Sequence, residues 1–284
     1  MKRKQRFENC IVYVALIILS FIWLIPIIWV ILTSFRETLG VASPTFIPTK
    51  FTLRNYQTLF NPGPVQALYI KFGRWMVNTT VIALLNMVIS TILILGAAYS
   101  LSRFRFKARK ALLNIALILG MFPGFMAMIA VFLLLNMLGL INQPMALLLV
   151  YASGSALGFY ISKGYFETIP IDLDEAAMID GADQWTIFTK IIMPLTKPIV
   201  VYTALMSFMA PWMDFILASL ILDHPDQKTV AVGLFGMIMD NADLYQNFTV
   251  FAAGSVITAL PIIIMYVLLQ RFIIQGISAG AVKG

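Results

Sequence analysis

Residues that could catalyse a reaction or hold a metal ion are scarce in this sequence. The chain has 284 residues but a single cysteine, Cys10, and a single histidine, His224. A metal centre built on thiolates or imidazoles needs several such ligands, so these two residues predict none. Cys10 borders a long apolar run, where we expect a packing role, and His224 stands beside Pro225, which favours a loop.

The sequence patterns of nucleophilic and nucleotide chemistry are absent as well. No run combines a nucleophile with a base and an orienting acid, and one histidine leaves little room for hydrolytic catalysis. The dipeptide Gly-Lys does not occur, which excludes a GxxxxGK[ST] phosphate-binding loop. We therefore expect a protein that is not an enzyme, with no catalytic residue, no metal and no cofactor bound by this chain.

The elements that carry the remaining polar groups are predicted to be membrane helices. Hydrophobic residues make up 60% of the chain and charged residues 12%, whereas soluble domains carry roughly 25% charged residues. Six apolar runs approach the length of about 20 residues that a helix needs to cross a bilayer. They cover residues 11–32, 75–101, 111–138, 144–161, 199–222 and 248–270. Because backbone groups in lipid must be satisfied within their own segment, the predicted fold is an all-α membrane protein with six transmembrane helices.

The distribution of positive charge predicts the orientation. With the N-terminus inside, 14 of the 20 Lys and Arg residues fall on the cytoplasmic side, so both termini are expected to be cytoplasmic. The basic excess is then topological and predicts no nucleic-acid partner. We expect a cytoplasmic N-terminus (residues 1–10) and one transmembrane domain (residues 11–284), with a cytoplasmic loop at 162–198 and a cytoplasmic tail at 271–284. The apolar core of the first run is longer than that of a signal peptide, so it is expected to be retained.

One polar stretch, Asp172–Pro198, differs from the rest of the chain and is called the acidic segment below. It holds five of the 13 acidic residues and lies in the cytoplasmic loop between the fourth and fifth runs. Asp172 and Glu175 have the spacing of a capping box, which predicts a helix start. Gly181 is expected to interrupt that helix. A second apolar stripe at helical spacing follows: Trp185, Phe188, Ile191 or Ile192, and Leu195.

Three interpretations of the acidic segment remain open from the residues alone. It could lie in the lipid headgroups, although its carboxylates would be repelled by anionic lipid. It could pack only against the helix ends of its own chain. It could instead insert into a partner protein.

A resemblance to a known family bears on this choice. Glu175-Ala176-Ala177, three residues, Gly181, nine residues, then Ile191-x-Met193-Pro194 resembles the EAA loop of bacterial ABC-importer permeases, with Met193 where Leu is more usual. In that family the loop docks on the ATP-binding subunit. The resemblance implies an ATPase-coupling role for Glu175, Ala176, Ala177, Gly181, Trp185, Phe188 and Pro194.

The chain end narrows the resemblance to the second permease of carbohydrate importers of the maltose type. The tail QRFIIQGISAGAVKG is similar to a C-terminus that reaches the ATPase interface, which implies that role for Gln275, Gly280, Lys283 and Gly284. A disordered basic tail is the alternative. The outer loop 223–247 resembles one that enters the sugar-binding protein, with Asp240, Asn241 and Asp243 as candidate contacts.

The resemblance also implies partners: a second homologous permease, an ATPase dimer that binds ATP and Mg, an extracytoplasmic sugar-binding protein and the lipid bilayer. The expected substrate is an oligosaccharide, either maltodextrin or a galacto-oligosaccharide or raffinose-type sugar. Trp212 and Asp214 are the candidate pathway residues, because aromatic faces and hydrogen-bonding groups suit sugars and an ionisable group inside a membrane helix is a functional candidate. Asp214 could instead hydrogen-bond a neighbouring helix.

Two other classes of protein compete with the importer hypothesis. A secondary transporter would show an internal repeat and paired ionisable residues at mid-membrane, whereas Asp214 stands alone and no convincing repeat is present. A membrane scaffold could use the acidic segment to recruit a cytosolic protein. In either case no separate ATPase would be needed for function.

Overall fold

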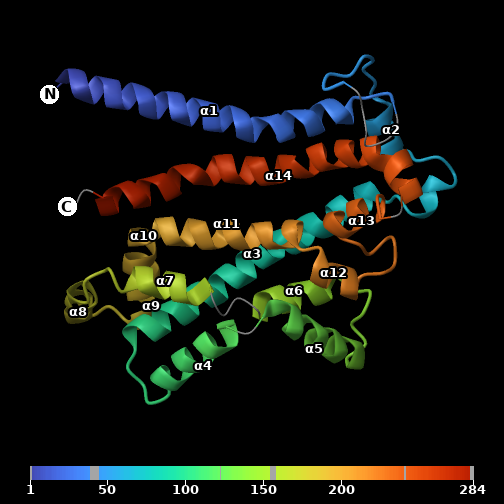
Figure 1. Cartoon of the computed structure of the whole chain (residues 1–284). Coiled ribbons are helices and arrows are strands. Elements are labelled where there is room, and N and C mark those ends of the chain that lie inside the picture. Colours follow the sequence, from blue (N-terminus) through green and yellow to red (C-terminus); the bar gives the residue numbers. More distant parts are fainter. Residues whose placement is uncertain (1, 39–44, 122, 154–157, 240, 282–284) are drawn as a thin grey trace. The chain divides into compact units, whose positions relative to one another are not determined.

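The computed structural model in Figure 1 describes residues 2–38, 45–121, 123–153, 158–239 and 241–281. Within these ranges the chain is helical, and β-structure is limited to one isolated bridge between Arg36 and Phe51. The predicted all-α class is therefore confirmed. The chain folds as two compact units, Met1–Phe72 with Gly233–Leu260, and Gly73–Val232 with Pro261–Gly284.

The first unit is built on two long helices joined by shorter elements. Its elements are α1 (Lys2–Ser34), α2 (Arg54–Phe60), a 3₁₀ turn η1 (Gln66–Leu68), most of α13 (Val230–Gly236) and the first half of α14 (Asn241–Ala281). The predicted outer loop 223–247 contains one of these helices, α13. Nearly all described apolar side chains of α1 from Ile11 to Ile28 are exposed, as expected of a helix that faces lipid or another subunit.

A buried amide holds this unit together at the end of α1. The Asn55 Nδ2 donates to the carbonyl oxygens of Ser34 at 2.9 Å and Arg36 at 2.8 Å. Its Oδ1 accepts from the Thr249 hydroxyl at 3.1 Å. One side chain on α2 therefore satisfies the end of α1 and fixes it to α14. On α14, Gly254 lies so close to Leu234 that an added Cβ would sit 2.5 Å from its Cδ2.

The second unit contains the remaining helices. They are α3 (Phe72–Arg103), α4 (Arg109–Met121), α5 (Gly124–Met137), α6 (Pro144–Ser153), α7 (Gly158–Phe166), α8 (Asp172–Ile179), α9 (Gln184–Thr186), a π-helical segment η3 (Ile187–Ile192), α10 (Met193–Leu195), α11 (Lys197–Met213) and α12 (Ile216–Ile221). One core cluster packs around Ile82, Leu147 and Ile221. Another packs around Leu95, Phe166 and Ile192, and it includes a residue of the acidic segment, Ala177.

The start of α3 is fixed by the connection that precedes α13. The Trp75 indole donates to the carbonyl oxygen of Pro225 at 2.7 Å. The Asn78 amide donates to the carbonyl oxygens of Asp226 at 2.9 Å and Lys228 at 3.1 Å. Side chains of α3 therefore hold the loop around His224 in place. His224 lies in a loop, as predicted.

The described helices include three that are long and apolar enough to span a membrane, and up to six if each bent pair forms one span. The three are Asn9–Ser34, Gln66–Arg103 and Leu244–Phe272, which contain the first, second and sixth predicted runs. Helices α4 with α5 and α6 with α7 correspond to the third and fourth. The fifth run is not one helix, because α11 ends at Met213 and α12 begins at Ile216. The count of six spans stays a prediction.

Candidate functional sites

Helix α8 begins at Asp172, as predicted, but without the predicted capping box. The residue before it, Ile171, already has a helical backbone (φ −67°, ψ −24°), and no side chain caps the first turn. The amide of Glu175 donates instead to the carbonyl oxygen of Ile171 at 3.1 Å. Asp172, Asp174 and Glu175 occupy the first turn, where negative charge is stabilised by the helix dipole.

Gly181 ends α8 in the way its residue type requires. Its φ is +85°, a left-handed conformation that side chains with a Cβ rarely adopt. The Gly181 amide donates to the carbonyl oxygen of Met178, and the Ala182 amide donates to that of Ala177. This pair of bonds is a Schellman motif, which satisfies the last carbonyls of the helix and reverses the chain. The predicted interruption at Gly181 is confirmed.

The next helix starts with a cap that sequence reasoning missed. The Asp183 Oδ1 accepts from the Thr186 amide at 3.0 Å, with Asp183 in an extended conformation. Hydrogen bonding from Thr186 lowers the pKa of the Asp183 carboxyl, so the cap is ionised at neutral pH. An Asp directly before the second apolar stripe is the signal that could have identified it.

The predicted apolar stripe of the second helix is wrong in part. Residues Ile187–Ile192 form a π-helix, and the buried side chains are Ile187 and Ile192, five positions apart. Trp185 is 69% exposed and Leu195 is also exposed. The Met193 amide donates to the carbonyl oxygen of Phe188, five residues back, as in a π-helix. The next residue, Pro194, has no amide hydrogen to donate. A pattern that assumes 3.6 residues per turn therefore assigns the wrong face.

The inner face of the acidic segment packs on its own chain, at the end of α7 as Figure 1 shows. Ala177 is buried in the core. The Phe188 ring contacts the Tyr99 ring of α3 at a centroid distance of 4.6 Å. The Nε of Arg103, the last residue of α3, lies 2.8 Å from the Oδ2 of Asp174. Both side chains of this ion pair are buried, and nothing in the sequence predicted it.

The outer face of the same segment is exposed and combines large apolar side chains with carboxylates. Ile179 is 87% exposed, and Leu173 and Met178 are also exposed. Glu175, Ala176, Gly181 and Pro194 are exposed with them. Of the seven residues predicted to couple to an ATPase, Ala177 is buried and Phe188 is half-buried, so these two hold the segment in place, whereas the other five face outward.

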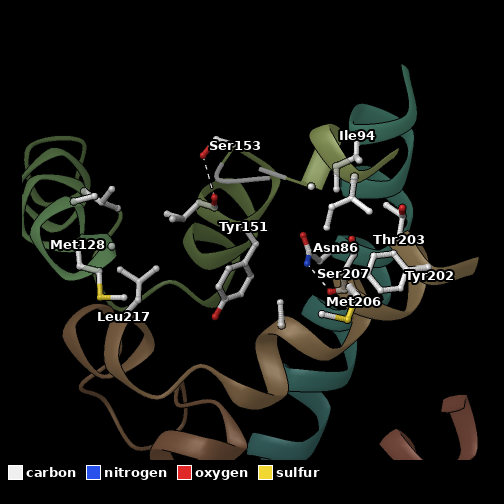
Figure 2. Close-up of a pocket in the computed structure, with 17 residues that line it drawn as sticks. Asn86, Ile94, Met128, Tyr151, Ser153, Tyr202, Thr203, Met206, Ser207 and Leu217 are labelled. Atoms are coloured by element: carbon white, nitrogen blue, oxygen red, sulfur yellow. Dashed lines mark hydrogen bonds between the residues drawn. The ribbon is translucent and has the colours of Figure 1, made fainter. Parts of the chain in front are cut away.

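A cavity of about 640 Å³ lies in the second unit among α3, α5, α6, α7, α11 and α12. Its walls are mainly apolar, and Figure 2 shows Asn86, Thr203 and Ser207 near one another with Tyr151 and Ser153 apart from them. The polar lining residues are Asn86, Tyr151, Ser153, Tyr202, Thr203 and Ser207. The Asn86 amide donates to the carbonyl oxygen of Ser207 at 2.6 Å, the dashed line between α3 and α11 in Figure 2. This bond fixes the polar wall.

The two predicted pathway residues lie beside this cavity rather than in its lining. The Asp214 Oδ1 accepts from the Leu217 amide at 3.1 Å, which caps α12. Its Oδ2 accepts from the Tyr151 hydroxyl at 2.7 Å, so Asp214 does bond a neighbouring helix. Trp212 is buried next to Phe208, and its indole nitrogen has no hydrogen-bond partner among the described residues. Tyr151, which the sequence did not single out, connects Asp214 to the cavity.

Residues 90–278 match the family described as the inner membrane component of binding-protein-dependent transport systems. The chain belongs to this family. The permease is 37% identical over 285 residues to the galactooligosaccharides transport system permease protein GanQ of Bacillus subtilis (strain 168), covering 100% of this chain and 99% of that protein. It is 36% identical over 287 residues, with the same coverage, to the maltodextrin transport system permease protein MalD of Streptococcus pneumoniae (strain ATCC BAA-255 / R6).

The fold of the permease also matches a solved structure. The crystal structure of a bacterial ABC transporter involved in the import of the acidic polysaccharide alginate contains a chain that superposes with a TM-score of 0.77. The two are 26% identical, and the match covers 95% of this chain and 97% of that chain. The predicted membership and location are therefore confirmed: this is a transport permease of the cell membrane with several membrane helices.

Some predicted contacts of the permease lie outside the side chains that the structure describes. Asp240, Lys283 and Gly284 lie outside the described residues. Asn241, Asp243, Gln275 and Gly280 belong to α14, of which only the backbone is described at these positions. The predicted roles of these seven residues at the binding protein and the ATPase stay predictions.

Proposed function

We propose that this permease is one transmembrane subunit of an ATP-driven, binding-protein-dependent importer of oligosaccharides. A second homologous permease would supply the other half of the pathway, and an ATPase dimer on the cytoplasmic side would bind ATP and Mg. The observation that carries the proposal is the acidic segment. It lies within the family match and is fixed to its own core on one face, while it exposes Glu175, Ile179 and Trp185 on the other.

The exposed face has the chemistry of a protein-docking surface. Large apolar side chains on a short cytoplasmic helix cost free energy in water, and a partner cleft would remove them from it. The carboxylates of the first turn are unsuited to anionic lipid. Of the three interpretations open from the sequence, insertion into the ATPase is therefore the one supported. The outward-facing Glu175, Ala176, Gly181, Trp185 and Pro194 would make the contact, with Ala177 and Phe188 as its support.

The proposed topology has six spans and both termini in the cytoplasm. The excess of Lys and Arg on that side supports it. It places the acidic segment and the tail residues Gln275, Gly280, Lys283 and Gly284 on the ATPase side. Asp240, Asn241 and Asp243 would then face the extracytoplasmic sugar-binding protein.

Maltodextrin is the proposed substrate, with a galacto-oligosaccharide as the alternative. The nearly equal identities to MalD and GanQ support both. The cavity near Tyr151 is a candidate part of the pathway, because its polar wall could exchange hydrogen bonds with sugar hydroxyls. Asp214 and Trp212 would shape that wall from behind.

Copurification and reconstitution test this function. Affinity purification of the tagged permease from its native membrane should recover an ATPase and a second permease. The complex in liposomes, with its binding protein outside, should take up radiolabelled maltotetraose or galactotetraose only when ATP is enclosed. A permease that transports alone on an ion gradient would establish the secondary-transporter alternative, and retention of a cytosolic protein without any transport would establish the scaffold.

A further inference from the structure

The ion pair between Arg103 and Asp174 is buried, although charged side chains are seldom buried in proteins. The exposed fractions of the two side chains are 7% and 4%, and the closest approach is 2.8 Å. The geometry falls short of a hydrogen bond at Arg103 Nε, and the Asp174 Oδ1 has no hydrogen-bond partner among the described residues. Such a pair contributes little net stability, because the loss of hydration offsets the attraction.

The surroundings of the pair connect it to three elements. Arg103 ends α3 and its Nη2 donates to the carbonyl oxygen of Ile169 at 3.1 Å, in the turn before α8. Tyr99, one turn earlier on α3, contacts the rings of Phe166 on α7 and Phe188 on η3. The last turn of α3 therefore holds the turn before α8, α8 itself and the π-helical segment.

Helix α8 has few other attachments. Within the described residues, its buried side chains are Asp174 and Ala177. Among the described residues, the contact of Asp174 with Arg103 is the one polar contact between a side chain of α8 and α3. Force applied to the outer face of α8 would therefore pass to α3 through this contact and the adjoining aromatic rings.

We propose that Arg103 and Asp174 are positioning residues that transmit movement between the acidic segment and α3. This inference rests on the proposed function, because it concerns how docking of the ATPase moves the membrane helices. A charged pair suits the role better than an apolar contact. The attraction resists separation over several ångströms in a low-dielectric site, whereas an apolar contact weakens within about 1 Å of gap.

A purely stabilising role makes a different prediction, and paired substitutions separate the two. Arg103→Gln leaves the carboxylate of Asp174 buried without its partner, so both roles predict a lower thermal midpoint. The double variant Arg103→Met with Asp174→Leu removes both charges and restores packing. We expect it to regain the thermal midpoint of the unaltered permease and still to transport about tenfold less sugar per ATP hydrolysed. Arg103→Lys, which keeps the charge, should retain most of the coupling.

The experiment uses the complete complex in liposomes and measures uptake, ATP hydrolysis and thermal midpoint together. Arg109→Gln is the matched control, because Arg109 pairs with the half-exposed Glu167 nearby and its loss should leave coupling unchanged. The proposal is overturned if the double variant recovers coupling along with stability, or if sugar transported per ATP stays within twofold of the unaltered complex in every variant.

A spectroscopic arm keeps this proposal separate from the proposed function. A spin label on Ile179→Cys, at an exposed position of α8, reports the mobility of that helix by electron paramagnetic resonance. We expect a markedly more mobile label when Asp174→Asn is added, because the contact between α8 and α3 is then weakened. An unchanged spectrum would overturn the proposal. Absence of ATP-driven uptake by the unaltered complex would instead defeat the proposed function, while the spectra would still decide whether the pair holds α8.

Discussion

Asp214 occupies a break in the apolar helix formed by α11 and α12. One carboxylate oxygen satisfies the amide of Leu217 and the other accepts from Tyr151. Both of its oxygens are thus used within the protein, so the group need not bind substrate to be accommodated in the membrane. From the sequence, Asp214 could line the pathway or hydrogen-bond a neighbouring helix. In the structure it makes the second contact, with Tyr151.

Substitutions at this pair should affect stability before they affect substrate preference. Asp214→Ala removes a helix cap and should lower the free energy of unfolding by about 1–2 kcal/mol. Tyr151→Phe removes one hydrogen bond and should lower it by roughly 1 kcal/mol. Thermal unfolding in detergent measures both, with Tyr202→Phe as the control, since Tyr202 lines the same cavity. Selective loss of one sugar at unchanged stability would show that Asp214 contacts substrate directly.

The burial of Asp174 predicts opposite pH dependences for coupling and stability. Burial raises the pKa of its carboxyl, against the opposing effect of Arg103, while Glu175 raises it further and Tyr99 lies beside it. Between the ordinary and the raised pKa the folded chain binds more protons than the unfolded chain, so this group's contribution to stability falls as pH rises.

Lowering the pH through the raised pKa should therefore weaken the ion pair and coupling while the folded state gains stability from this group. Sugar transported per ATP and the thermal midpoint, measured from pH 8 to pH 5, check the prediction. The comparison is with Asp174→Asn, in which the contribution of residue 174 to stability should not change with pH. Parallel pH profiles in the two proteins would contradict it.

At the scale of elements, the acidic segment combines a rigid inner face with an exposed outer one. Glu175→Lys should leave insertion and stability intact, because Glu175 is exposed, and should uncouple ATP hydrolysis from uptake. Gly181→Glu should do the same at an added cost of about 1 kcal/mol, since its φ of +85° is strained for any other residue. Asp172→Lys, in the same turn, is the control for charge alone. Normal uptake in both variants would refute the docking role.

Helix α14 depends on close packing at Gly254. An added Cβ would lie 2.5 Å from the Cδ2 of Leu234, with Phe72 and Leu59 also within 4 Å. Gly254→Ala requires Leu234 to shift, and Gly254→Val should cost about 1–3 kcal/mol by overpacking. A second substitution, Leu234→Ala, should recover part of the thermal midpoint lost in Gly254→Val. Absence of any recovery would place the strain elsewhere.

Local rules predicted some of these elements and failed at others. The end of α8 at Gly181 follows from residue type, since a glycine with a left-handed backbone is a local requirement. The capping box predicted at its start did not form. The π-helix at Ile187–Ile192 buries Ile187 and Ile192, five positions apart, so a stripe drawn at 3.6 residues per turn missed it. The pairing of Arg103 with Asp174 joins residues 71 positions apart, and no local pattern contains that information.

At the scale of the whole molecule, composition was sufficient for the class of protein and insufficient for its span count. Apolar runs show which segments are long enough to cross a bilayer. They do not reveal breaks within a helix, such as the one at Asp214. The cavity near Tyr151 is lined by six helices, with lining residues that range from Asn86 to Leu217. Such a site is set by tertiary packing, which explains why the predicted pathway residues fall next to it.

The proposed topology makes a prediction for labelling from outside the cell. In a Cys10→Ser background, a cysteine at Leu68, which is exposed in η1, should react with a membrane-impermeant maleimide. A cysteine at Ile179 should react only after the membrane is opened. Lys228→Cys serves as a second outer control. Labelling of Ile179→Cys in intact cells would invert the proposed orientation and remove the acidic segment from the reach of any ATPase.

The π-helical segment η3 has a consequence for how sequences of this kind can change in length. A π turn contains one residue more than an α turn. Deleting a single residue between 187 and 192 would convert it to an ordinary α-helix without breaking the chain. Because the π turn takes up its extra residue within a single turn, the deletion would leave the helical faces before and after η3 in nearly the same relative orientation. A homologue that is one residue shorter here would therefore present the same exposed side chains of the acidic segment to a docking partner.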